Sequence, residues 1–254
     1  MLLQERKIEL KSPREIEIMR RAGHLVGEIL QQVAAEARPG MSTLDLDALA
    51  ERLTLKAGAK PAFKNYRGYR HTICASVNDQ VVHGVPSRAA LQAGDIIGID
   101  FGVILEGFYG DSAITLPVGE ISDEARRLLE AGKEALERGI AQAAPDKRLG
   151  DIGAAVQTFV EDLGYSVVRE MVGHGIGRAL HEEPQVPNYG RPDTGARLRP
   201  GMVLAIEPMI NVGGSEIETL DDGWTVVTED GSLSAHFEHT VAITEHGPEV
   251  LTRL

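Results

Sequence analysis

LQAGDIIGIDFGVILEGFYGDSAITL, residues 91–116, is the stretch that decides the fold of this 254-residue chain. Two strand-like runs, about 96–104 and 107–116, flank a tight turn at Leu105-Glu106 or Glu106-Gly107. Apolar runs on either side of so short a turn are typical of an antiparallel hairpin. The sequence therefore predicts a β-hairpin near the middle of the chain.

Each strand of this hairpin carries an acid. Asp100 lies inside the first apolar run, and Asp111 follows eleven residues later on the second. If both side chains face the same side, this spacing places them opposite each other on neighbouring strands, where they can share one ion or bridge two. Glu207 in MVLAIEPMI (202–210) and Glu238 in LSAHFEHTVAI (233–243) have the same apolar, strand-like setting.

Acids in such runs need a partner, because an unpaired ionised carboxylate is costly to bury. His174 in VGHGIG (172–177) adds an imidazole to the four carboxylates. The charges of four carboxylates balance those of two divalent ions, and oxygen with nitrogen ligands favours Mn, Fe(II), Co or Zn. We therefore predict that Asp100, Asp111, His174, Glu207 and Glu238 converge on two divalent cations.

Each residue also has an ordinary structural explanation. Asp100 alone is more often an ion-pair partner, and His174 alone a turn or packing residue. His83 in VVHGVP and His181 in ALHEEP are structural by the same argument. Cys74 is expected to be a small buried apolar residue, since a nucleophile needs a nearby base. HExxH and GxSxG motifs are absent, and the glycines around His174 lack a P-loop setting. The joint occurrence of the five ligands favours the metal site.

The remaining elements follow from periodicity and capping signals. Ser12, Pro13 and Glu15 form a capping-box pattern at the start of the first predicted helix. We expect helices over residues 12–37, 43–55, 122–143 and 149–163, and further strands over 72–77, 166–170, 202–211, 224–228, 236–244 and 249–252.

A weak internal repeat organises these elements. LQAGDIIGID (91–100) aligns with LRPGMVLAIE (198–207), so that Asp100 and Glu207 occupy equivalent positions; Asp45 likewise aligns with Asp151 and Pro39 with Pro145. A helix-helix-strands unit used twice predicts one domain over 1–254, with pseudosymmetric halves at about 12–116 and 121–252.

Composition limits the classes of protein. The 43% hydrophobic content allows a substantial core, and the net charge of −12 argues against a broad surface for nucleic acid or anionic membranes. No run reaches the roughly 18 apolar residues of a membrane span, and the charged start is unlike a signal peptide. Cys74 is the single cysteine, which fits a reducing compartment. We expect a cytoplasmic monomer without sequence-specific nucleic-acid or membrane partners.

Five segments, in order, resemble a known family. NYRGYRHTICASVNDQVVHGVP, DIIGIDFGVILEGFYGDSAIT, MVGHGIGRALHEEPQVPNYG, GMVLAIEPMI and SAHFEHTVAI look like those of type I methionine aminopeptidases of the short bacterial kind. A zinc-finger extension before the first helix and the type II insertion are both missing. The resemblance implies an α+β pita-bread (creatinase/aminopeptidase) fold, in which two αβ halves surround a central curved antiparallel sheet. It places the family's metal ligands on the five residues already named.

The resemblance also implies an activity, removal of the initiator methionine before a small second residue. A hydroxide held between two cations would attack the carbonyl carbon, with Glu207 as general base. His181 would bind the carbonyl oxygen or the tetrahedral intermediate, and His83 the scissile amide nitrogen. Tyr66, Tyr69, Cys74 and Trp224 would line the methionine pocket. Leu180 departs from the aromatic residue often found before the second histidine, which puts the fine side-chain preference in doubt.

Further family properties and two rival functions complete the expectations. Asn78 and Ser234 match positions that hold a monovalent cation in some relatives. The expected partners are nascent polypeptide N-termini, and ribosome association fits the substrate although no motif for it is visible. One alternative is an Xaa-Pro aminopeptidase, which normally carries an additional N-terminal domain. The other is a nonenzymatic pita-bread binding protein, which usually loses metal ligands.

Overall fold

The computed structural model of the chain describes residues 7–254, and all four predicted helices are present. The signal-peptide prediction rests partly on residues 1–6, which lie outside the described residues. Ser12 and Glu15 form the predicted capping box. None of the described helices is both long and apolar enough to cross a membrane. The helices are α1 (Pro13–Glu36), α2 (Thr43–Lys56), α3 (Asp123–Gln142) and α4 (Leu149–Asp162).

The main sheet combines strands from both ends of the sequence. Its order is β1-β4-β5-β14-β9-β7-β8, with β2 also pairing β4 and β15 pairing β14. All its pairs are antiparallel. The bounds are β1 (Lys60–Pro61), β2 (Ile73–Val77), β4 (Ile96–Leu105), β5 (Phe108–Pro117), β7 (Gly173–Gly175), β8 (Glu182–Val186), β9 (Val203–Ile206), β14 (Glu238–Thr244) and β15 (Gly247–Val250).

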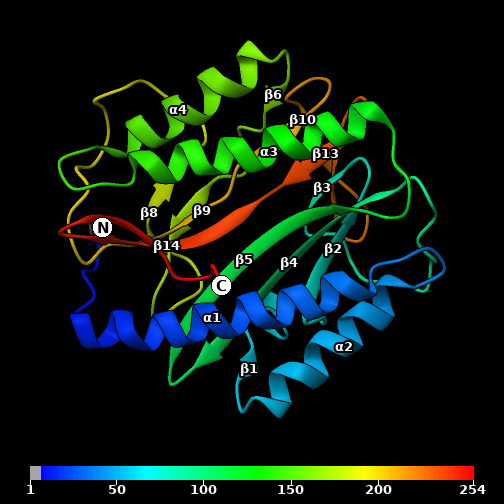
Figure 1. Cartoon of the computed structure of the whole chain (residues 1–254), viewed down its shortest axis with the longest axis horizontal. Helices are drawn as coiled ribbons and strands as arrows, with labels where there is room; N and C mark the ends of the chain where they lie inside the picture. Colours follow the sequence, from blue (N-terminus) through cyan, green and yellow to red (C-terminus); the bar gives the residue numbers. More distant parts are fainter. Residues whose placement is uncertain (1–6) are drawn as a thin grey trace.

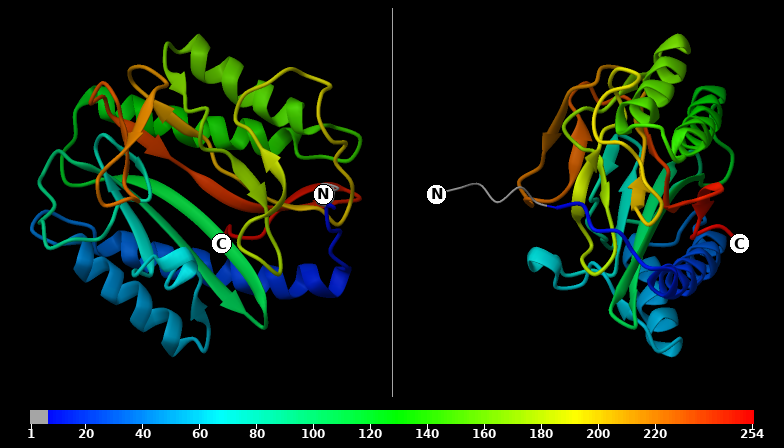
Figure 2. Two further views of the ribbon diagram at one scale, coloured as in Figure 1. Left: turned by 180° about the vertical axis from the view of Figure 1, so that it is seen from behind. Right: turned by 90° about the vertical axis from the view of Figure 1, so that its left-hand side faces the viewer.

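Two three-stranded sheets flank the main sheet, in the orders β13-β10-β6 and β11-β12-β3. Figures 1 and 2 show the four helices along one side of the main sheet, with α1 and α2 over one half and α3 and α4 over the other. This is the predicted pita-bread architecture. The smaller sheets consist of β3 (Gln80–Val82), β6 (Ser166–Val167), β10 (Met209–Asn211), β11 (Ile217–Thr219), β12 (Val226–Thr228) and β13 (Ser234–His236).

The hairpin of β4 and β5 forms as predicted, but its register corrects one expectation. The turn is Glu106-Gly107, whose φ angles of 50° and 84° are left-handed, as a two-residue hairpin turn requires. Leu105 therefore pairs with Phe108. Asp100 then pairs with Ala113 and Asp111 with Gly102. The two acids are not directly opposite; they lie diagonally, two residues apart, on the same face.

Two predicted strands are each divided in the structure. Residues 202–211 form β9 and β10, which belong to different sheets and are separated by Glu207 and Pro208. Residues 236–244 are divided at Phe237 between β13 and β14. Proline cannot donate a ladder hydrogen bond, which explains the first break. Glu207 therefore lies at a bend rather than in a strand. Sequence patterns also missed β1, β3, β7, β8 and β11, which are too short to show clear alternation.

The two halves have separate apolar cores. One contains Ile29, Leu46 and Phe101 under α1 and α2, and the other contains Leu128 and Ile152 under α3 and α4. Asp45 and Asp151 take the same capping position, at the third residue of α2 and α4 respectively. These equivalences support the internal duplication, which stays a prediction. The main sheet joins the cores and carries the site between them.

Candidate metal centre and substrate pocket

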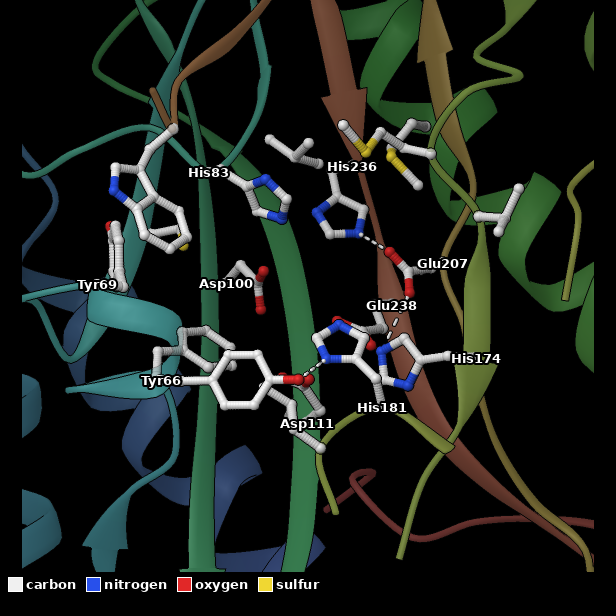
Figure 3. Close-up of a pocket in the computed structure, with 18 of the residues that line it drawn as sticks. Tyr66, Tyr69, His83, Asp100, Asp111, His174, His181, Glu207, His236 and Glu238 are labelled. Carbon is white, nitrogen blue, oxygen red and sulfur yellow. Dashed lines mark hydrogen bonds and ion pairs between the residues drawn. The ribbon is translucent and has the colours of Figure 1, made fainter. Parts of the chain in front are cut away.

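The five predicted metal ligands come from strands that are neighbours in the main sheet. Asp100 lies on β4, Asp111 on β5 and Glu238 at the start of β14. His174 lies on β7, and Glu207 directly follows β9. Figure 3 shows their side chains directed toward one shared space. The structure therefore brings together residues that are up to 138 positions apart in the sequence.

Distances define the centre of this cluster. One ligand atom each from Asp111, His174 and Glu238 lie within 4.8 Å of one another, and all three residues are buried. Glu207 Oε1 lies 3.5 Å from His174 Nε2. Asp100 is outside the three-residue group, but its carboxylate is close enough to those of Asp111 and Glu207 for both to raise its pKa. Carboxylates of three residues, Asp111, Glu207 and Glu238, therefore lie near His174.

The carboxylates are electrostatically unsatisfied without a cation. Burial, followed by the neighbouring acids, raises the pKa values of Asp100, Glu207 and Glu238 well above normal, and burial raises that of Asp111 to about 7. Asp100 Oδ1 and Asp111 Oδ1 are buried without a hydrogen-bond donor among the described residues. A divalent cation would supply the missing partner. The donor set therefore fits metal binding.

Surrounding hydrogen bonds hold the ligands in place. His174 Nδ1 lies 3.0 Å from the carbonyl oxygen of Gly175, so its proton resides on Nδ1 and the Nε2 lone pair faces the acids. Thr240 Oγ1 accepts from the amide of Asp111 and donates to its carbonyl, at 3.1 and 2.7 Å. The side-chain amide of Asn188 donates to the main-chain carbonyl of Glu207 at 2.9 Å. These contacts hold the ring of His174 and the main chains of Asp111 and Glu207 in place.

A cavity of about 180 Å³ opens beside the acids. Its wall is largely aromatic, aliphatic or sulfur-containing. The Tyr69 and Trp224 rings meet edge to face at 5.0 Å, and the Tyr69 hydroxyl donates to the carbonyl of Ile73 at 2.9 Å. The four pocket residues predicted from the sequence line this cavity: Tyr66, Tyr69, Cys74 and Trp224. Leu180, which departs from the family pattern, lines it too. Burial, followed by the charge of Asp100, raises the pKa of the Cys74 thiol, so Cys74 is an apolar wall residue.

The two predicted substrate-contacting histidines line the same cavity. The His181 Nδ1 atom lies 2.8 Å from the Tyr66 hydroxyl, and its ring centroid lies 4.3 Å from that of His174. His83 has a left-handed φ of 59°, an uncommon conformation for a residue with a side chain. Desolvation lowers the pKa values of both His83 and His181. Both rings are therefore neutral at pH 7.

Sequence reasoning missed several residues of the site. His236 is buried, and its Nε2 atom lies 3.6 Å from Glu207 Oε2. A signal was available, because His236 precedes Glu238 by two residues and alternate strand residues share a face. The other unpredicted wall residues are Phe63, Arg67, Val82, Met171, Val172 and Met209, which have no local motif.

Asn78 and Ser234, predicted for a monovalent cation, are neighbours, and Ser234 is the first residue of β13. The Ser234 amide donates to the carbonyl of Asn78 at 3.0 Å. The Asn78 side-chain oxygen accepts from the amide of Ile96 at 3.0 Å, and its nitrogen donates to Asp95 at 2.9 Å. The two residues are thus neighbours, and the cation itself stays a prediction.

Comparison with known proteins agrees with this geometry. Residues 17–245 match the model of metallopeptidase family M24. The chain belongs to this family. It is 54% identical to methionine aminopeptidase 1 of Bacillus subtilis over 96% of this chain and 98% of that protein. The crystal structure of methionine aminopeptidase from Thermotoga maritima, at 46% identity, superposes with a TM-score of 0.96 over 98% of this chain and 100% of that one.

A more distant structural neighbour shares the fold but much less of the sequence. The prolidase from Pyrococcus furiosus is 25% identical with a TM-score of 0.79, and the match covers 96% of this chain but 65% of the prolidase. The pita-bread fold is therefore shared, while similarity over the full length of both proteins lies with the methionine aminopeptidases. Family membership and the cluster of Asp111, His174 and Glu238 together identify a site for divalent metal.

Proposed function

We propose that this protein removes the N-terminal methionine from new polypeptides whose second residue is small. The observation that carries the proposal is that an acidic cluster and a group of aromatic, aliphatic and sulfur-containing side chains line one cavity. An exopeptidase for methionine needs both: charged ligands where the α-amine and scissile carbonyl bind, and a soft apolar wall for the thioether.

Two divalent cations would be held by Asp100, Asp111, His174, Glu207 and Glu238. Bound there, such cations lower the pKa of water and polarise a carbonyl. Mn, Fe(II), Co and Zn all suit this set of oxygen ligands with one nitrogen.

Glu207 is the proposed general base. Its carboxylate lies at the edge of the cluster, 3.5 Å from His174 Nε2 and 3.6 Å from His236 Nε2. Neither neighbour is cationic at pH 7, because burial lowers both histidine pKa values. Glu207 is therefore free to accept a proton from water and to transfer it to the leaving amine.

His181 and His83 are the proposed substrate donors. If the Tyr66 hydroxyl donates to His181 Nδ1, the imidazole proton resides on Nε2 and can be donated to the carbonyl oxygen. A donor fixed in advance stabilises the negative charge that develops on that oxygen. His83, on the opposite wall of the cavity (Figure 3), would contact the scissile amide nitrogen.

The pocket wall supports methionine as the first residue. Aromatic and sulfur contacts with a thioether are favourable and adapt to its flexible chain. Tyr69, Cys74 and Trp224 supply such contacts, together with Phe63, which the sequence had not indicated. A cytoplasmic location follows from this substrate, because initiator methionine is exposed where polypeptides are made.

Two rival functions share this fold. An Xaa-Pro aminopeptidase is less well supported, because the prolidase match leaves about a third of that chain uncovered. A nonenzymatic binding protein is less well supported because all five proposed ligands are present and line one cavity.

Peptide hydrolysis separates the three functions. We expect Mn(II)- or Co(II)-loaded protein to cleave a Met-Gly peptide, to cleave Met-Leu much more slowly, and to leave Xaa-Pro peptides intact. A chelator should abolish the activity, and restored metal should recover it. Cleavage of Xaa-Pro in preference to Met-Gly would transfer the protein to the first rival class. No cleavage of any peptide by fully metal-loaded protein would favour the second.

A further inference from the structure

A buried ion pair connects the segment before α1 to the loop that carries His181. Lys11 and Glu182 form this pair, and their side chains are only 4% and 12% exposed. Burying an ion pair this deeply is costly, because both charges lose their contact with water. Neither residue lines the catalytic cavity. The pair therefore calls for an explanation other than direct contact with the substrate.

Glu182 also closes the loop itself. While Oε2 contacts the Lys11 ammonium, Oε1 accepts from the main-chain amides of Arg178 and Ala179 at 2.7 and 3.1 Å. The carboxylate thus ties the beginning of the β7–β8 connection to its end. His181 is the residue immediately before Glu182, so its main chain is held by this closure.

The aliphatic part of the Lys11 side chain is tightly packed. A Cβ atom on Gly177 would lie 2.2 Å from Lys11 Cε, so the stem packs directly on the glycine backbone. The Lys11 amide donates to the carbonyl of Gly201 at 2.7 Å, just before β9. The amide of Tyr109 on β5 donates to the carbonyl of Gly177 at 2.8 Å. Lys11 is therefore fixed at its main chain and along its side chain.

A second contact reinforces the first. Arg178 Nη2 donates to Glu15 Oε1 at 2.8 Å, while the other Glu15 oxygen caps α1 through Ser12. The Arg178 guanidinium also lies 4.5 Å from the ring centroid of Phe108. The start of α1 thus holds the loop at two points.

We propose that Lys11 is a positioning residue that acts through Glu182 to hold His181 at the distance it needs from Tyr66 and His174. The catalytic part of this proposal rests on the proposed function. Lys11 itself touches no substrate. Without it, Glu182 becomes an unpaired buried charge, the loop loosens, and His181 loses its fixed place.

Kinetics of Lys11→Met test this role. We expect kcat for a Met-Gly peptide to fall about tenfold or more, with KM changed less than about twofold, because His181 is assigned to the transition state. Lys11→Arg, which keeps the charge, should recover much of the loss. Arg21→Met is the matched control: it removes an exposed ion pair between α1 and Glu106 and should leave kcat unchanged.

A double-mutant cycle distinguishes positioning from general destabilisation. In a His181→Ala background, Lys11→Met should cause no further loss of kcat, because the group it positions is already gone. An equal fold-loss in both backgrounds would overturn the proposal. If Lys11→Met does not fold, Lys11→Met/Glu182→Gln leaves no unpaired buried charge and takes its place in the same cycle.

Amide hydrogen exchange tests the clamp without a peptide. Lys11→Met should speed exchange in residues 176–183 while leaving α3 unchanged. Unchanged exchange in that loop would overturn the proposal whatever the enzyme's substrate. If the wild-type protein instead fails to cleave Met peptides but the loop loosens as expected, the proposed function fails and the clamp stands.

Discussion

Glu207 lies between two imidazoles: His174 Nε2 is 3.5 Å from one carboxylate oxygen, and His236 Nε2 is 3.6 Å from the other. Burial lowers the pKa of His174 to about 4 and that of His236 to about 3. Both rings are neutral at pH 7, so neither cancels the charge of the carboxylate. The Nε2 atom of His236 has no hydrogen-bond partner among residues 7–254, and Glu207 Oε2 lies 3.6 Å from it.

This arrangement makes His236 a testable support for the general base. We expect His236→Leu to lower kcat about fivefold, since one polar contact is worth about 1 kcal/mol. His236→Gln, which keeps a side-chain donor, should lose less. Steady-state kinetics on a Met-Gly peptide measure the effect, with metal content determined on each sample. Equal activity of the Leu and Gln variants would show that the polar contact has no role.

Glu207→Gln separates proton transfer from the overall shape of the site. The amide matches the carboxylate in size but cannot accept the water proton, so we expect kcat to fall roughly 10²- to 10⁴-fold. The metal content of the variant must be measured, because Glu207 is also a proposed ligand. If the variant keeps its metal and hydrolyses Met peptides at near the wild-type rate, the general-base assignment is wrong.

Leu180 and Phe63 line the same pocket and belong to one apolar cluster. Placing an aromatic residue at position 180 should overpack that cluster. We expect Leu180→Phe to raise KM for Met peptides and to lower the free energy of unfolding by about 1–3 kcal/mol.

The double variant Leu180→Phe/Phe63→Leu exchanges the two side-chain types and keeps the total volume. It should recover most of the stability and affinity lost by the single variant. Denaturant unfolding and peptide kinetics provide both measurements. A double variant no better than Leu180→Phe alone would mean that the two positions do not share space.

The sequence predicted the helices and the long hairpin because their signals are local. The Ser12 capping box lies within four residues, and the β4–β5 turn within two. Short strands such as β7 have no such signal, because three residues around His174 take their conformation from neighbours distant in the chain. Pro208 could have located the break after β9, since proline interrupts a ladder.

The metal ligands were predictable for a chemical reason rather than a geometric one. A carboxylate in an apolar run needs a partner, and Asp100 and Glu238 line the same cavity in the structure; that both bind metal stays a prediction. The register between Asp100 and Asp111 was not predictable, because the sequence was compatible with two positions of the turn. Phe63 and Met209 reach the pocket only through the tertiary fold, and nothing in their local sequence distinguishes them from core residues.

Protons and metal should compete at Asp111. Burial raises the pKa of its carboxyl from 3.8 to about 7 in the folded protein without a cation. The folded state then binds this proton more tightly than the unfolded chain does. The stability it contributes is complete below about pH 4 and is lost as the pH rises to about 7. His174 does not compete in this window, because its pKa of about 4 leaves it neutral.

Cation binding requires the deprotonated carboxylate, so it should stabilise the protein most where the proton stabilises it least. We expect the rise in Tm on adding Mn(II) to chelator-treated protein to be small at pH 5 and to grow steadily up to pH 7.5. Scanning calorimetry at fixed free Mn(II) measures this rise. The growth with pH reflects all four buried carboxyls, because burial also raises the pKa values of Asp100, Glu207 and Glu238. Asp111→Asn, whose amide does not titrate, should therefore reduce this growth without abolishing it. A rise in Tm that is constant across this range, or larger at pH 5, would mean that these carboxylates do not hold the cation.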